Sequence, residues 1–157
     1  MKEKTSSGWL SPDEQQNWRS FVRVHQALAA RLGKDLQTHA KLSGAEFEIL
    51  VPLTDVPDGR LRFQDLAKAI EWEQSRLSHQ ISRMIKRGLV AREECAEDGR
   101  AAFVAITPTG RQIIEAAAPH HVATVRGLVI DALTAEEFAA LGRLSTRILD
   151  HLDQITP

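Results

Sequence analysis

The sequence predicts a mainly α-helical fold that contains one small β-hairpin. Apolar residues recur at the spacing of an amphipathic helix over most of the 157 residues. Serine or threonine stands where helices would begin, at Ser11, Ser43, Thr107 and Thr134. An Asp-Gly pair between two short apolar runs, Asp98-Gly99, is a strong hairpin signal. The hairpin would therefore interrupt a chain of helices.

Composition limits the kind of function. With 43% hydrophobic residues, the chain can bury one sizeable core. The formal net charge is -1, so nucleic-acid binding would need a local cationic patch. Aromatic residues make up 5% and tyrosine is absent, which argues against a protein that stacks single-stranded bases on exposed rings.

The sequence also indicates where the protein works. No apolar run approaches the roughly 20 residues that a membrane span needs, and the N-terminal residues lack the apolar segment of a signal peptide. The one cysteine, Cys95, excludes an internal disulfide and fits a reducing cytosol. We therefore expect a cytoplasmic protein with no membrane partner.

A flexible tail, residues 1–10, precedes the first predicted helix. Ser11 is a helix cap, Pro12 suits the first helical position, and acidic residues follow in the first turn. The helix is predicted from Pro12 to about Ala40. One face carries Trp18, Phe21, Val22, His25, Leu28, Ala29, Leu32 and Leu36. A helix this long overhangs a small domain, so its apolar face needs a partner, and a second subunit would provide one.

Two short helices follow in the prediction. Ser43 and Glu46 form a capping box, and the helix that they start is expected to bend or end near Pro52. A turn at residues 56–59 leads to a second short helix, Leu61 to Ile70.

The stretch Gln74 to Val90 reads as a helix with two different faces. Its apolar side carries Leu77, Ile81, Met84 and Ile85. Its other side carries Ser75, Ser78, His79, Ser82, Arg83 and Lys86, with Arg76 at the edge. The stretch contains no carboxylate, although the whole chain is almost charge-balanced. A solvated amphipathic helix would explain this face, and so would a helix that enters a DNA major groove.

A β-hairpin is predicted directly after this helix. Gly88 can end the helix, residues 89–94 form the first strand, and Ala101 to Ile106 form the second. Two short helices followed by such a hairpin make a winged helix-turn-helix, with the hairpin as its wing. This context favours the DNA-binding interpretation of the cationic face.

The last predicted helices run from Pro108 to about Ile130, with a kink at Pro119, and from Thr134 onward. The final helix lines Phe138, Leu141, Leu144, Ile148, Leu149 and Leu152 along one face. These apolar faces exceed what the middle domain can cover, so we expect a homodimer. The predicted domains are dimerisation helices at 11–57, a winged helix-turn-helix at 58–107 and dimerisation helices at 108–157.

Three motifs follow one another in the run from Ser75 to Arg111: Arg87-Gly88-Leu89-Val90, Asp98-Gly99-Arg100 and Ile106-Thr107-Pro108-Thr109-Gly110. Their type and order resemble the MarR family of bacterial transcription regulators, and the resemblance extends over essentially the whole chain. The resemblance implies a triangular homodimer that binds pseudo-palindromic operators on double-stranded DNA. It also implies a regulator that mostly represses and that releases DNA when a small aromatic or anionic effector binds.

DNA contacts follow from this interpretation. Arg76 and Arg83 are candidates for guanine contacts, and Ser75, Ser78, Ser82 and His79 for phosphates or base edges. Lys86 and Arg87 are expected to touch phosphate or solvent. The resemblance implies that Arg100 at the wing enters the minor groove and that Asp98 braces it. The interpretation of Asp98 as a turn-former alone stays open.

An effector pocket is harder to locate. The candidates are Trp18, His25 and His39 on the first helix, Phe47 on the second, and Arg111. An activator, an effector-independent regulator and a redox-responsive regulator using Cys95 stay open, although the carboxylates around Cys95 disfavour a reactive thiolate. A winged helix that binds protein instead of DNA is a further alternative.

No cofactor or metal is expected. His120 and His121 are adjacent, and adjacent helical residues point about 100° apart, so the two rings cannot easily share one ion. The sequence contains no glycine-rich phosphate loop and no nucleophile motif, so it does not predict an enzyme.

Overall fold

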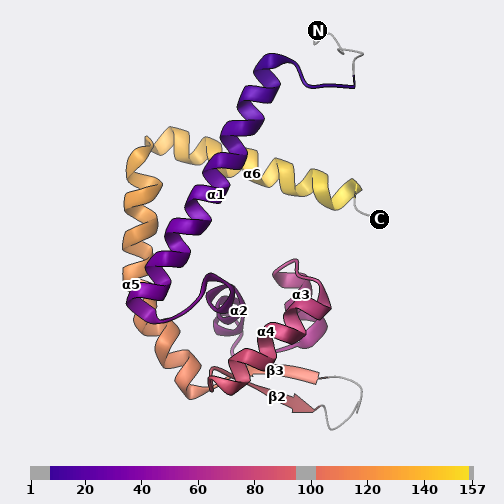
Figure 1. Cartoon of the computed structure of the whole chain (residues 1–157), viewed down its shortest axis with the longest axis vertical. Coiled ribbons are helices and arrows are strands. Elements are labelled where there is room, and N and C mark those ends of the chain that lie inside the picture. The colour runs from indigo at the N-terminus through magenta and orange to yellow at the C-terminus, as the bar shows by residue number, and fades with distance from the viewer. Residues whose placement is uncertain (1–7, 95–101, 156–157) are drawn as a thin grey trace. The chain divides into compact units, whose positions relative to one another are not determined.

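The computed structural model describes residues 8–94 and 102–155 (Figure 1). In chain order the elements are α1 (Pro12–Ala40), α2 (Gly44–Asp55), β1 (Arg60–Arg62), α3 (Phe63–Ala69), α4 (Gln74–Lys86), β2 (Val90–Glu94), β3 (Ala102–Ile106), α5 (Pro108–Leu128), a 3-10 turn (Ile130–Ala132) and α6 (Ala135–Ile155). The chain forms two compact units, Met1–Ala117 and Ala118–Pro157. Among the described helices, none is both long and apolar enough to span a membrane.

The helix starts predicted from local sequence are confirmed by their hydrogen bonds. At α1, the Ser11 hydroxyl accepts from the Glu14 amide at 3.3 Å, and the Glu14 carboxylate accepts from the Ser11 amide at 2.9 Å. Ser43 and Glu46 form the same reciprocal pair at α2. Each pair satisfies amides that would otherwise lack a partner in the first turn. Helix α1 ends at Lys41, whose φ of 56° is left-handed.

Pro52 lies inside α2, which ends three residues later at Asp55. The proline lacks the amide hydrogen that would bond the carbonyl four residues earlier, so α2 loses one helical hydrogen bond there. Leu53, directly after it, is fully buried together with Ile49 and Leu50. Burial of this apolar side of α2 keeps the last residues helical despite Pro52.

The predicted helix from Leu61 to Ile70 is wrong at its start. Residues Arg60–Arg62 form strand β1, which pairs with β3 so that Arg60 faces Ala105 and Arg62 faces Phe103. Helix α3 begins only at Phe63. A strand of three residues obtains its hydrogen bonds from a segment about forty residues further along, and helical periodicity in a short window cannot reveal such pairing.

The predicted hairpin is confirmed. Strands β2 and β3 pair antiparallel from Val90 opposite Ile106 to Glu94 opposite Ala102, and the complete sheet has the order β1-β3-β2. The hairpin tip, including Cys95, Asp98 and Arg100, lies outside the described residues. Val104 and Val90 are 1% and 2% exposed, so one face of the sheet closes the hydrophobic core.

The core of the first unit joins α2, α3, α4 and the sheet. Its members with no exposed surface are Leu42, Ile49, Leu50, Leu53, Leu66, Leu77 and Met84. Leu77, Ile81 and Met84 are buried as predicted from the apolar side of α4. Ile85, predicted for the same side, is instead 40% exposed, because it lies at the edge of that side, 100° further around the helix than Met84.

The second unit contains the end of α5, the 3-10 turn and α6. Thr134 and Glu137 form the predicted capping box of α6, with hydrogen bonds of 3.2 and 2.8 Å. Hydrogen bonding to the Glu137 carboxylate, first from the Thr134 backbone amide and then from the Thr134 side chain, lowers the pKa of Glu137 below its usual value. No residue of α6 is buried, and its apolar stripe, from Phe138 to Ile155, is 42–60% exposed.

Candidate nucleic-acid interface

The turn before α4 fixes where this helix begins. Glu71 adopts a left-handed φ of 54°, which lets the chain reverse direction within a few residues without a glycine. Trp72 follows and is only 8% exposed, and its indole Nε1 donates to the Glu48 Oε1 of α2 at 3.0 Å. The buried indole therefore attaches the start of α4 to α2.

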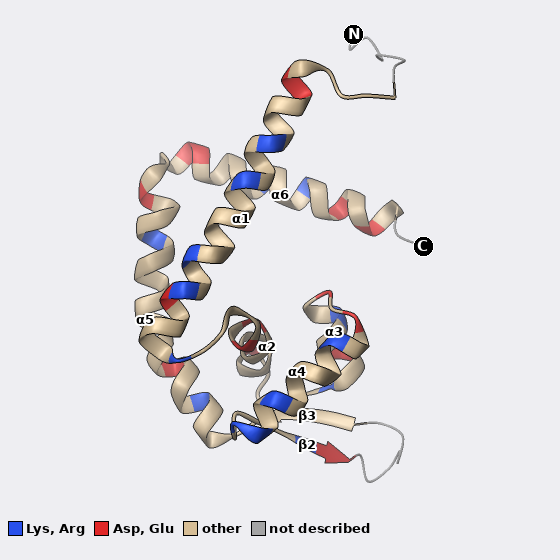
Figure 2. Cartoon of the chain, viewed as in Figure 1, with Lys and Arg blue, Asp and Glu red and all other residues tan. Residues whose placement is uncertain are grey.

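Helix α4 presents one cationic, hydrogen-bonding face to solvent. All seven residues predicted for this face are exposed: Ser75, Arg76, Ser78, His79, Ser82, Arg83 and Lys86. Figure 2 shows basic residues and no acidic residue on α4, in contrast to the acidic β2. The Ser82 hydroxyl donates to the Ser78 carbonyl at 2.9 Å, so it meets a ligand as an acceptor.

Arg76 is held over the indole ring of Trp72. Its guanidinium carbon lies 3.6 Å from the ring centroid, a close cation–π stack. Arg76, His79 and Arg83 line a concavity of about 310 Å³ together with Ala45, Trp72 and Gln80. Because stacking restricts its rotamers, Arg76 loses less conformational entropy on binding than a free surface arginine.

Arg87, at the end of α4, keeps 42% of its side chain exposed, which fits the predicted solvent contact, but its guanidinium also pairs within the protein. Its Nη1 donates to the buried Glu46 Oε1 of α2, and its Nη2 donates to the Lys41 carbonyl at 2.8 Å. The sequence of α4 gave no sign of this pairing, because the partners lie more than forty residues earlier.

The start of α5 holds the chain that leaves α4. The Thr107 hydroxyl donates to the Gly88 carbonyl at 2.6 Å and accepts from the Gly110 amide at 3.0 Å. A Cβ atom on Gly110 would lie 2.1 Å from the Leu89 carbonyl oxygen. The Thr-x-x-Gly motif is therefore required for close packing of α5 on the end of α4.

Sequence reasoning missed a group of arginines on the sheet. Arg60 and Arg62 lie over the ring of Phe103 at 5.1 and 5.6 Å, and Arg60 also pairs with Glu93 at 3.3 Å. On β2, Arg92 lies 5.8 Å from the ring of Phe63. The alternation Arg-Leu-Arg, with Leu61 between two cations, was the available signal, because its period of two is typical of a strand.

The candidate effector residues are spread along the first unit. Trp18 and His25 are exposed on α1, and the Trp18 ring stacks on Phe21 with centroids 5.8 Å apart. His39 lies 21 positions after Trp18, which corresponds to roughly 30 Å of helix. Trp18 and His39 of one chain therefore cannot line one small pocket.

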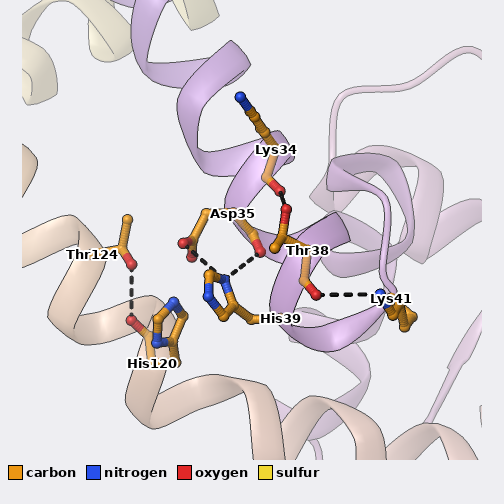
Figure 3. Close-up of polar contacts among 7 residues, drawn as sticks. All are labelled: Lys34, Asp35, Thr38, His39, Lys41, His120 and Thr124. Atoms are coloured by element: carbon orange, nitrogen blue, oxygen red, sulfur yellow. Dashed lines mark hydrogen bonds and ion pairs between the residues drawn. The ribbon is translucent and has the colours of Figure 1, made fainter.

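His39 turns back along α1, as Figure 3 shows. Its Nδ1 lies 3.1 Å from the Asp35 carbonyl and 3.2 Å from the Asp35 carboxylate. Phe47 packs against the hydrophobic core. Arg111 lies against Gly59 and pairs with Glu115 at 3.6 Å. Figure 3 also shows Thr124 of α5, whose hydroxyl donates to the His120 carbonyl at 3.1 Å.

These features define a class of protein. Helices α3 and α4 form a helix-turn-helix, the three-stranded sheet supplies the wing, and α4 exposes a cationic face beside that wing. The molecule is a winged helix DNA-binding protein.

Comparison with known proteins gives the family. Residues 40–101 match the MarR family model. The chain is 40% identical to AbsC, a MarR family transcriptional regulator from Streptomyces coelicolor, over 94% of this chain and 99% of that one, with a TM-score of 0.88. It is 36% identical to Sco3205, a MarR family regulator from the same organism solved in complex with DNA, over 94% of this chain and 92% of that one, with a TM-score of 0.89.

The chain belongs to the MarR family of transcription regulators. Members of this family are DNA-binding proteins without enzymatic activity. A more distant relative is BpsR from Bordetella bronchiseptica, 26% identical over 91% of this chain and 99% of that one, with a TM-score of 0.77. The DNA binding of BpsR is regulated by 6-hydroxynicotinic acid.

Proposed function

We propose that this chain is a homodimeric repressor that occupies a pseudo-palindromic operator and releases it when a small aromatic or anionic molecule binds. The observation that carries the proposal is the exposed face of α4, which has arginine, histidine and serine side chains and no carboxylate. In this proposal α4 is the recognition helix, the helix that enters the major groove.

The exposed apolar residues support the homodimer. On α1, Trp18, Phe21 and Val24 are 52–57% exposed, and α6 exposes a stripe of apolar side chains along its whole length. Burying such surface against a second copy would contribute about 25 cal/mol per Å². A twofold dimer would place two recognition helices roughly one DNA turn, about 34 Å, apart.

The residues on the exposed face of α4 are assigned to different parts of the DNA by the length and chemistry of their side chains. Arg76 and Arg83 are proposed to bind guanine O6 and N7, because the planar guanidinium matches this acceptor pair. The proposed partners of Ser75, Ser78, His79 and Ser82 are base edges or phosphates, and the proposed partner of Lys86 is a phosphate. At the wing, Arg100 is proposed to enter the minor groove and Asp98 to orient it.

A relative supports the proposed control by an effector. The regulation of BpsR by 6-hydroxynicotinic acid shows that a relative of this fold responds to a small aromatic acid. For this chain the proposed pocket residues are Trp18, His25, His39, Phe47 and Arg111. Since Trp18, His25 and His39 are spread along α1 of one chain, the proposed pocket would draw on both subunits.

One experiment tests the proposal. The purified protein is used to select duplexes from a random pool, and the selected duplex is titrated by gel shift at several salt concentrations. We expect an inverted repeat whose half-sites are about 10 base pairs apart, with binding that weakens steeply as salt rises. Selection of no motif, or of a single unrepeated half-site, would overturn the proposal.

A further inference from the structure

We propose that Arg87 and Glu46 are a positioning pair: Arg87 holds the end of the recognition helix against α2 without touching DNA, and operator affinity depends on this contact. The inference rests on the proposed function of α4. In this inference Arg87, the last arginine of the stretch Gln74 to Val90, has a structural role within the protein and not a contact with DNA.

Glu46 is an unusual carboxylate in this structure. Its side chain is 5% exposed, and among the described residues it is the one charged residue in the buried class. Its Oε2 accepts from the Ser43 amide at 2.8 Å and thereby caps α2, and its Oε1 accepts from Arg87. Both oxygens are therefore used, as a buried carboxylate requires.

Arg87 reaches a second point on the same junction. While Nη1 binds Glu46, Nη2 binds the carbonyl of Lys41, the left-handed residue that ends α1. One guanidinium thus connects the end of α4 to the end of α1 and the start of α2. A lysine ammonium lacks the planar fork that can reach both acceptors in this arrangement.

The backbone around Arg87 makes this contact effective. Arg87 is the C-cap of α4, its amide donates to the Arg83 carbonyl at 3.1 Å, and Gly88 then turns the chain with a φ of 71°. Arg83, one turn earlier on the helix, is a proposed base-contacting residue. A shift of the helix end would move Arg83 relative to α2, so the pair controls the orientation of the reading face.

Salt dependence separates positioning from direct contact. Removing a residue that neutralises a phosphate lowers the slope of log affinity against log salt by about one. Removing a positioning residue lowers affinity for the selected duplex and leaves that slope unchanged. Lys86 is exposed, lies next to Arg87 in sequence and is proposed to contact phosphate, so Lys86→Gln is the matched control.

The experiment uses the full chain with Arg87→Gln, Glu46→Gln, the double variant and Lys86→Gln. Affinity for the selected inverted-repeat duplex and for a random-sequence duplex is measured by fluorescence anisotropy across a salt series. We expect Arg87→Gln and Glu46→Gln each to weaken binding to the selected duplex more than tenfold with the wild-type slope. We also expect the double variant to be no weaker than either single one, because both remove the same contact.

Circular dichroism and light scattering establish that each variant is folded and has the wild-type oligomeric state. Should Arg87→Gln fail to fold, Glu46→Gln still tests the pair, since its amide oxygen can keep capping α2. A slope reduced by about one in Arg87→Gln, or wild-type affinity in Glu46→Gln, would overturn the inference. Failure to select any duplex would count against the proposed function instead.

Discussion

Single atoms decide the packing at Gly110, at the start of α5. The space that a Cβ would need is already occupied by the Leu89 carbonyl, which belongs to the chain leaving α4. The same carbonyl accepts from the Thr107 amide at 3.1 Å, and the Thr107 hydroxyl, whose hydrogen bonds the Gly88 carbonyl, lies 3.1 Å away. A backbone oxygen with these partners cannot move away cheaply, so the restriction at Gly110 is steric and strict.

Gly110→Ala should therefore lower the stability of the first unit. Forced overpacking of this kind costs about 1–3 kcal/mol, which thermal or urea unfolding will measure. The control is Gly127→Ala, near the end of α5, where no atom lies within 4 Å of the added Cβ. In a helix that control should be neutral or slightly stabilising, since alanine favours helix over glycine. Equal melting temperatures for the two variants would contradict the packing argument.

Arg83→Ala should relax sequence preference at one base of each half-site. A good bidentate contact between an arginine and a guanine is worth about 1–3 kcal/mol of discrimination. Repeating the duplex selection with the variant should give a motif that is degenerate at that position. Recovery of the unchanged wild-type motif would remove Arg83 from the base contacts.

At the scale of the element, the sequence predicted features that depend on residues a few positions apart. It did not predict features whose partners lie far apart in the chain. Ser11, Ser43, Thr107 and Thr134 cap the helices that they were predicted to start, because a cap involves residues three positions apart. Strand β1 was missed because its partner β3 lies about forty residues away. The pairing of Arg87 was missed for the same reason, since its carboxylate partner belongs to α2.

Helical periodicity was enough to predict the exposed cationic face of α4. Its exposed residues were identified from angles on a helix alone, and the structure places all of them at the surface. The stack of Arg76 on Trp72 could not be predicted in this way. The stack depends on the backbone conformation at Glu71, which lies before α4 and sets the position of the Trp72 indole next to Arg76.

The wing provides a prediction for a whole element. Arg100→Ala should weaken operator binding more than tenfold without changing the oligomeric state, if the wing arginine enters a narrow minor groove. The control is Arg92→Ala, on the strand that leads to the tip. The Arg92 side chain lies near Phe63, so its removal should weaken operator binding much less. A gel-shift titration measures both. Unchanged affinity for Arg100→Ala would reject the role of the wing.

At the scale of the whole molecule, the two units differ in how they are stabilised. The buried core, from Leu42 to Ile114, belongs entirely to the first unit. Helix α6 contributes no buried residue in a single chain, although its capped start and long apolar stripe are typical of a helix that packs against another. In the proposed dimer, the second unit would therefore depend on association more than the first.

Leu144→Glu should separate the proposed dimer into single chains. Leu144 lies within the apolar stripe of α6 and is 53% exposed, and a carboxylate there would have to be buried without a partner. Light scattering at micromolar concentration should detect the single chain. Operator affinity should fall about a hundredfold or more, because two linked half-site contacts become independent.

The control for Leu144→Glu is Thr146→Glu, which adds the same charge on the opposite side of α6. Since none of the core residues lies on α6, the first unit should melt normally in both variants. A dimer that persists in Leu144→Glu would show that the exposed stripe is not the contact between subunits.

The apolar stripe and the reading face belong to different helices, α6 and α4, so in the proposed dimer a change in one helix need not disable the other. A copy whose α4 can no longer bind DNA would still associate through α6 with an intact copy. In a cell that carries both alleles, such mixed dimers would outnumber the dimers with two intact copies. Each mixed dimer would contact the operator through one recognition helix only. Loss-of-function alleles in α4 should therefore be dominant, whereas alleles that disable α6 should be recessive.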